Sequence, residues 1–177
     1  AVLIKGCDVF NRFLVLSEQA KGLNQVKVID LENNDVHYVV FDEPVYEVYT
    51  TQNYNFDTDK LRLVFSSLKT PAVTFDYHMQ DKTRTVLKQQ EVLGGYNSSR
   101  YTTERVLAPA KDGAFIPVSL VYKKELKKTG KNPLLLYGYG SYGITIEPSF
   151  SSHIFSLIDR GFVYAIVHIR GGQVNGR

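Results

Sequence analysis

A group of short strands that recurs after about 46 to 49 residues constrains the fold of this chain more than any other feature. The segment FLVLS (13–17) matches RLVFS (62–66), and VIDLENNDVHYV (28–39) resembles TFDYHMQDKTRTV (74–86). β-Branched and aromatic residues dominate these segments, and the Asn-Asp cluster at 33–35 favours a turn. A repeat of this length made of three or four strands is typical of a β-propeller blade. We therefore predict propeller blades over residues 1–95, with a β-sandwich as the alternative.

The composition is that of a folded soluble protein. Hydrophobic residues make up 44% and charged residues 22%, which excludes a disordered chain. The one basic cluster, at 123–131, lacks interleaved aromatic residues, so a solvated loop is favoured over a nucleic-acid site. No apolar run approaches the roughly 20 residues that span a bilayer, and no signal peptide precedes the charged residues that follow Ala1. We expect neither a nucleic-acid nor a membrane partner.

A single cysteine, Cys7, excludes an internal disulfide framework and suits a reducing compartment, so we expect a cytoplasmic protein. Cys7 itself is interpreted as a small buried residue rather than a nucleophile. We expect no metal and no cofactor. A single blade cannot close a propeller ring, the chain begins without methionine, and it ends at RGGQVNGR without a closing element. These features predict a fragment of a longer protein.

The character of the sequence changes after Gln90. Residues 91–101 form a turn-rich linker, which places a domain boundary between residues 95 and 96. Asp112-Gly113 predicts a hairpin over 104–124, with Pro109 and Pro117 at a sheet edge or a bulge. Further segments are a strand buried on both faces at 133–139, a helix from Pro148 to Gly161, and a second apolar strand at 162–172. Strand, helix and strand form a right-handed crossover unit, so residues 96–177 are expected to open an α/β domain.

Three glycines follow the first of these strands with the spacing G-x-G-x-x-G, at Gly138, Gly140 and Gly143. In a dinucleotide site this spacing requires a helix that begins on the loop itself. Here residues 144–148 intervene and include the carboxylate of Glu147, which argues against a bound phosphate. A phosphorylated dinucleotide held by Arg170 stays open as a minor alternative.

Three tyrosines interleave with these glycines, at positions 137, 139 and 142. Because glycines remove side-chain bulk, at least one phenol should be exposed at the carboxyl end of a central strand, where α/β sheets place their sites. A phenolic O–H is a good donor to a developing oxyanion. Simple packing of these rings at the sheet edge is the alternative.

The motifs LLLYGYGSYG, EPSF and RGFVYAIVHIRGG resemble those of the prolyl oligopeptidase family of serine peptidases, and within it the oligopeptidase B type. The resemblance implies a propeller followed by an α/β-hydrolase domain, and hydrolysis of short peptides after Lys or Arg through an acyl-enzyme. It also implies that Tyr139 donates its hydroxyl to the oxyanion. Gly138, Gly140 and Gly143 would shape the turn. By the same match, Arg170, Gly171 and Gly172 would belong to the surroundings of the active site.

The catalytic triad of such an enzyme is not found in the sequence. An α/β-hydrolase places its serine in a G-x-S-x-G elbow, and no such motif occurs; Ser141 has Tyr139, not a glycine, two residues before it. His37, His78, His153 and His168 are all interpreted as structural. The nucleophile, base and orienting Asp are therefore expected outside this chain, which should be inactive alone.

A departure from the family pattern follows Gly172, where the chain reads Gln173-Val174-Asn175 in place of a small residue and an acidic one. This departure and the missing triad leave a second hypothesis open. The chain would then be a non-catalytic, propeller-like binding module with a degenerate α/β unit.

Overall fold

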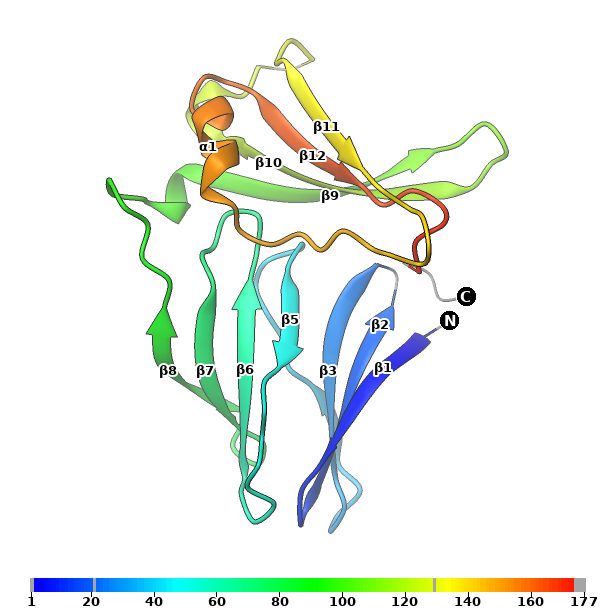
Figure 1. The fold of residues 1–177 in the computed structure, drawn as a ribbon, viewed down its shortest axis with the longest axis vertical. Coiled ribbons are helices and arrows are strands. Elements are labelled where there is room, and N and C mark those ends of the chain that lie inside the picture. The colour runs from blue at the N-terminus through cyan, green and yellow to red at the C-terminus, as the bar shows by residue number, and fades with distance from the viewer. Residues whose placement is uncertain (1, 21, 129, 174–177) are drawn as a thin grey trace.

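The repeat in the sequence forms two four-stranded antiparallel sheets, drawn in the lower part of Figure 1. The computed structural model describes residues 2–20, 22–128 and 130–173. The first sheet contains β1 (Val2–Val9), β2 (Phe13–Ala20), β3 (Leu23–Asp30) and β4 (Val36–Tyr38), in that order. The second contains β5 (Glu47–Thr50), β6 (Lys60–Ser66), β7 (Val73–His78) and β8 (Thr83–Gln89), also in chain order.

The two copies of the repeat occupy equivalent places in the two sheets. FLVLS lies in β2 and RLVFS in β6, the second strand of each sheet, and the longer segments cover β3–β4 and β7–β8. β4 ends at Tyr38. Beyond it the chain crosses to the second sheet and buries Val39, Val45 and Tyr46 on the way.

One hydrophobic core fills the space between these sheets. Alternate residues of β3 and β6 point inward, as the two-residue period of a half-buried strand requires. Val28, Leu61 and Leu63 are fully buried there. Phe41, from the crossing segment, stacks on Phe65 with ring centroids 4.5 Å apart. Neither sheet buries its inner face alone, so the two form one packing unit.

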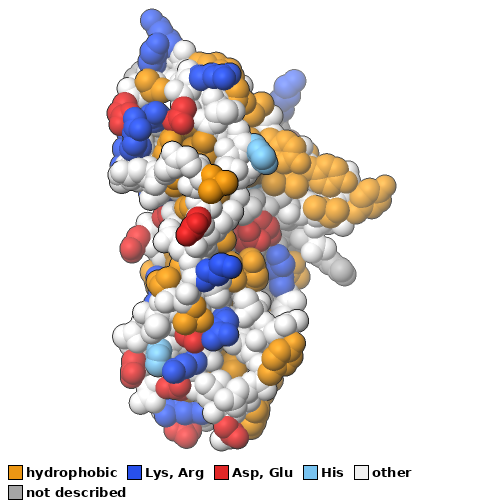
Figure 2. Space-filling view, turned by 60° about the vertical axis from the view of Figure 1, so that its left-hand side comes forward, with side chains coloured by type: hydrophobic (Ala, Val, Ile, Leu, Met, Phe, Trp, Pro, Cys, Tyr) orange, Lys and Arg blue, Asp and Glu red, His pale blue; other side chains and the backbone are white. Residues whose placement is uncertain are grey.

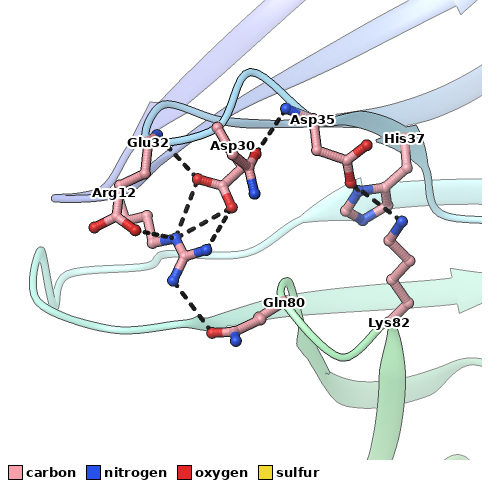
Figure 3. Close-up of polar contacts among 8 residues, drawn as sticks. Arg12, Asp30, Glu32, Asp35, His37, Gln80 and Lys82 are labelled. Carbon is pink, nitrogen blue, oxygen red and sulfur yellow. Dashed lines mark hydrogen bonds and ion pairs between the residues drawn. The ribbon is translucent and has the colours of Figure 1, made fainter.

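Polar contacts join the same sheets at one end (Figure 3). The Arg12 guanidinium donates to both carboxylate oxygens of Asp30, with an Nη2–Oδ2 distance of 2.6 Å, and lowers the pKa of that carboxyl. Arg12 also donates to Gln80 in the second sheet's β7–β8 turn at 3.3 Å. In the same turn, Lys82 donates to Asp35 at 3.2 Å. Solvent-exposed polar contacts thus link the ends of the two sheets, in addition to the shared core.

The third sheet is mixed and lies above the other two in Figure 1. It contains β9 (Tyr101–Pro109), β10 (Phe115–Lys123), β11 (Leu134–Gly138) and β12 (Val163–Val167), in the order β11-β12-β10-β9. β11 and β12 run parallel and are joined through α1 (Ser152–Ile158), whereas the other pairs are antiparallel. The predicted hairpin and the strand–helix–strand unit are both confirmed. No helix in the described ranges is long and apolar enough to cross a membrane.

Three sequence-based predictions about the third sheet are wrong. The helix begins at Ser152 rather than Pro148, because Phe150 N donates to Ser66 Oγ of the second sheet at 3.0 Å and is held outside it. β11 is exposed along its whole length, because β12 is its one strand neighbour in the described residues. β12 ends at Val167, so the strand stops well before Gly172.

The interpretation of the prolines is half right. Pro109 ends β9, which is an edge strand, but Pro117 lies in β10, between β9 and β12. The missing N–H is tolerated because β12 pairs with β10 from Val118 onward. The expectation for Cys7 is also wrong, since this residue of β1 is exposed.

An aromatic cluster joins the third sheet to the second. Tyr96 stacks on Tyr101 with centroids 5.3 Å apart and meets Phe155 of α1 edge-on at 5.0 Å. The Tyr96 hydroxyl donates to the carbonyl of Lys69 at 2.5 Å. Leu68, in the same β6–β7 loop, is buried in this cluster. The junction is therefore packed like a domain core.

Phe155→Ala should lower the free energy of unfolding by about 3–5 kcal/mol, because it removes a buried ring with three aromatic neighbours. Denaturant unfolding would measure the loss. The matched control is Phe56→Ala, whose ring is 53% exposed and whose loss should be small. Equal losses for the two variants would show that the junction contributes little to stability.

Candidate functional site

The glycine-rich turn lies at the carboxyl end of β11, beside the segment that follows β12. Gly143 N donates to Gly171 O at 2.9 Å, and Gly143 forms an isolated bridge with Gly172. In Figure 1 both connections leave the same edge of the third sheet. The structure thus brings together the two predicted parts of the site, residues 138–143 and 170–172.

Only a glycine fits at position 140, because the two segments lie too close together for a side chain there. A Cβ at this position would collide with the Arg170 carbonyl oxygen and lie 2.7 Å from Ile169 Cγ1. Gly143 has a positive φ of 73°, which most side chains disfavour. The glycines therefore shape the turn through a backbone-to-backbone contact.

Each tyrosine of the turn presents part of its ring to solvent. Tyr137 is 46%, Tyr139 40% and Tyr142 95% exposed. Tyr139 is the first residue after β11, between the strand and the Gly140 contact. The phenol can therefore reach a group bound outside the sheet edge, while its backbone is held in place.

Arg170 is engaged by an ion pair across the sheet. Its guanidinium donates to both carboxylate oxygens of Asp112 at 2.5 and 2.9 Å, and this lowers the pKa of the Asp112 carboxyl. Asp112 lies at the tip of the β9–β10 hairpin. The pair directs the Arg170 guanidinium toward the hairpin tip, although both side chains remain more than half exposed.

The geometry also argues against a dinucleotide on the turn. α1 begins at Ser152, well beyond Gly143, so its first N–H groups do not belong to the glycine turn. Glu147, in the intervening segment, pairs with Lys5 of β1 at 3.4 Å. Among the residues with described positions, no group of three His, Cys, Asp or Glu could hold a metal ion.

Sequence reasoning missed a buried serine–histidine pair. His168 Nε2 lies 2.8 Å from Ser119 Oγ, and the two residues are 4% and 1% exposed. Burial, together with the nearby positive charge of Arg105, lowers the pKa of His168 to about 4. The alternation of apolar residues predicts strands but not the register of β10 against β12 that brings these two together.

This pair lacks the features of a nucleophile and its base. A catalytic base is oriented by a third group and must be reached by substrate. His168 Nδ1 is buried without a partner among the described residues, and the serine is inaccessible. The histidines near carboxylates are His37, 4.0 Å from Asp35, and His78, 3.8 Å from Asp59, both in the blade sheets. His153 lies in α1. The structural interpretation of His168 therefore stands.

Comparison with known proteins defines the class. Residues 1–90 match the family model of the prolyl oligopeptidase N-terminal β-propeller domain. The chain belongs to the prolyl oligopeptidase family, and the relatives that it matches are named as peptidases. The sheets β1–β4 and β5–β8 are accordingly propeller blades, as the repeat predicted, and not the halves of a sandwich.

Two relatives and two solved structures show the range of the similarity. Dipeptidyl aminopeptidase BI of Pseudoxanthomonas mexicana is 45% identical over 99% of this chain and 24% of its own length. Protease 2 of Moraxella lacunata is 31% identical over 95% of this chain and 24% of its own. Oligopeptidase B from Trypanosoma brucei, in a closed form with covalently bound antipain, superposes with a TM-score of 0.88 at 41% identity. Oligopeptidase B from Leishmania major gives 0.87 at 36%. Each of these structures is matched over 99% of this chain and 26% of its own. The chain thus spans about a quarter of the length of its relatives.

Gly140→Ala should lower the free energy of unfolding by about 1–3 kcal/mol, because the added methyl must push two backbone segments apart. Gly6→Ala is the matched control, since nothing lies within 4 Å of its Cβ position and the change should be neutral or stabilising by up to about 1 kcal/mol. Denaturant unfolding of both variants checks the contact. Equal effects would contradict it.

His168 should make stability fall with acid. Its pKa is about 4 in the fold and near the ordinary 6.5 when unfolded, so the unfolded chain takes up the proton first as the pH falls. The contribution is fully present above pH 6.5 and is lost toward pH 4, with a total on the order of 3 kcal/mol. Comparing the unfolding of the wild type with His168→Gln at pH 7.5 and 4.5 measures this term. The exposed His153→Gln is the control, and an equal acid loss in wild type and His168→Gln would refute the expectation.

Proposed function

We propose that this chain is a segment of a serine oligopeptidase that hydrolyses short peptides by acyl-enzyme chemistry, with the Tyr139 hydroxyl as one oxyanion donor. One observation carries the proposal. A partly exposed phenol sits at the carboxyl end of β11 on a backbone fixed by the contact of Gly140 with Ile169 and Arg170. A donor held in advance where negative charge develops stabilises the tetrahedral intermediate without reorganising.

We assign residues 1–95 to the end of the propeller and residues 96–177 to the start of an α/β-hydrolase catalytic domain. The mixed sheet with its parallel β11–α1–β12 unit supports this assignment. Figure 2 shows hydrophobic side chains gathered over the part of the molecule formed by the third sheet. Exposed apolar residues of that sheet include Leu107, Phe115, Leu134 and Leu136. In a larger parallel sheet further strands would pair with β11, and the connecting helices would cover the faces that carry such residues.

For the substrate we propose short peptides with a basic residue before the cleaved bond, and for the location the cytoplasm. The support for the substrate is the likeness to two oligopeptidase B structures, one of them with antipain bound. Other relatives are named dipeptidyl aminopeptidase and prolyl endopeptidase. Hydrolysis of matched peptides with Lys, Arg or Pro before the reporter group, by the full-length protein, would separate these specificities.

The chain of 177 residues should not react with a fluorophosphonate, because the nucleophile and base are assigned to the remainder of the protein. Intact mass after labelling, with circular dichroism to show that the sample is folded, is the measurement. The full-length protein should gain one label under the same conditions. A labelled short chain would place the nucleophile within these residues, and a full-length protein without label or hydrolysis would favour the non-catalytic binding module.

Tyr139→Phe in the full-length protein should lower kcat by about 10²–10³ with little change in KM, because the donor acts on charge that develops in the transition state. Tyr142→Phe is the matched control in the same turn, and kcat should be retained because this ring is 95% exposed. Steady-state kinetics with a basic dipeptide reporter measures both. An unchanged kcat for Tyr139→Phe would remove the residue from the oxyanion site.

A further inference from the structure

The segment after β12 is attached to β10 by two hydrogen bonds of one residue. His168 N donates to the carbonyl of Pro117 at 3.0 Å, and His168 Nε2 lies 2.8 Å from Ser119 Oγ. The side-chain bond is buried, while the other side-chain anchor of this segment, the Asp112–Arg170 pair, is exposed to solvent. Exposed ion pairs hold geometry weakly, so the buried pair is the firmer attachment.

The attached segment in turn supports the glycine turn. Ile169 and Arg170, directly after His168, are the residues against which Gly140 packs, and Gly171 O accepts the Gly143 N–H at 2.9 Å. A shift of His168 relative to β10 would therefore move the surface on which the Tyr139 backbone rests. The buried pair is thus connected to the phenol in three steps. His168 is followed by Ile169, Ile169 packs against Gly140, and Gly140 follows Tyr139.

We propose that His168, held by Ser119, is a positioning residue that sets the place of Tyr139 through the segment 169–171. The proposal rests on the proposed role of Tyr139 as an oxyanion donor. It assigns no proton transfer to His168 and no nucleophilic role to Ser119. The hydrogen bond between His168 and Ser119 is needed to keep the geometry of the glycine turn, and the imidazole does more than fill space in the core.

The chemistry of the pair favours this role over simple packing. An apolar side chain would fill the same volume without leaving His168 Nδ1 buried and unpartnered among the described residues. Arg105 lies opposite Ser119 in the β9–β10 register, and its positive charge together with burial keeps the imidazole neutral. A neutral ring with one directional bond holds its orientation unchanged across neutral pH.

A double-mutant cycle in the full-length protein tests the proposal. Ser119→Ala should lower kcat by roughly 10-fold and leave KM within about twofold, since misplaced catalytic groups lose rate before binding. In the Tyr139→Phe background, Ser119→Ala should cause no further loss. If Tyr139→Phe lowers kcat but Ser119→Ala adds its full factor in that background, the positioning role is overturned alone. If Tyr139→Phe leaves kcat unchanged, the oxyanion role itself is overturned, and the inference with it.

A second pair of variants covers the case in which Ser119→Ala does not fold. The terminal amide of His168→Gln reaches the place of Nε2 and can bond Ser119, whereas that of His168→Asn is one bond shorter and cannot. His168→Gln should keep kcat within about threefold, and His168→Asn should lose roughly 10-fold. Equal kcat values for these two variants would overturn the proposal.

A matched control separates positioning from stability. Ser67 is another fully buried serine, whose hydroxyl donates to Glu43 Oε2 at 2.6 Å within the blade region. Ser67→Ala should lower the melting temperature by an amount comparable to Ser119→Ala without lowering kcat. A fall of kcat in proportion to stability for both variants would show that the loss reflects general destabilisation, which would overturn the proposal.

Discussion

The contact between the backbone of Gly140 and that of Ile169 and Arg170 is the constraint on which the candidate site depends. It joins the ends of two parallel strands, so both loops must leave the sheet at fixed positions. With any side chain at residue 140 the loops would separate. The position of the Tyr139 phenol is therefore set by the backbone on either side of it. The turn is held in place by its backbone contact, and the tyrosine is exposed because the neighbouring glycines have no side chains.

The same loop also couples the site to the propeller. Residues 144–151 run from the glycine turn to α1 along both blades. Glu147 pairs with Lys5 of the first blade, and Phe150 N donates to Ser66 of the second. The half-buried carboxyl of Glu47 lies close enough to Glu147 that desolvation and this second charge raise its pKa. The segment that continues from the glycine turn therefore contacts both blades.

Local sequence patterns predicted most of the elements, because their causes are local. The repeat located both blades, since strand spacing and turn residues are properties of neighbouring positions. Asp112-Gly113 located the hairpin, because a tight turn needs positive φ values. Gly161, with a φ of 94°, follows the helix as predicted.

The errors arise where contacts distant in sequence decide the outcome. Pro148 is a favourable first residue for a helix, but the hydrogen bond from Phe150 N to Ser66, 84 residues earlier in the chain, delays the start of the helix. The run of leucines in β11 predicts burial, but exposure depends on which strands lie beside it. The pairing of Ser119 with His168 depends on the register of β10 against β12, which no local pattern encodes. For the site, the sequence and the resemblance supplied the residues 138–143 and 170–172, and the structure supplied how they touch.

The spacing G-x-G-x-x-G can therefore serve two different chemistries for one physical reason. In a dinucleotide site, glycines let a pyrophosphate approach the backbone at the start of a helix. In this chain the groups that approach are protein atoms. The Arg170 carbonyl occupies the space beside Gly140, and the Gln173 side chain lies beside Gly143, with Nε2 2.9 Å from the Cβ position. Gln173 is the first residue at which the sequence departs from the family pattern; Val174 and Asn175 lie outside the described residues. Protein atoms thus occupy the space beside both glycines, while the tyrosines of the turn remain exposed to solvent. The glycine spacing specifies a close approach, and the residues after the next strand decide what approaches.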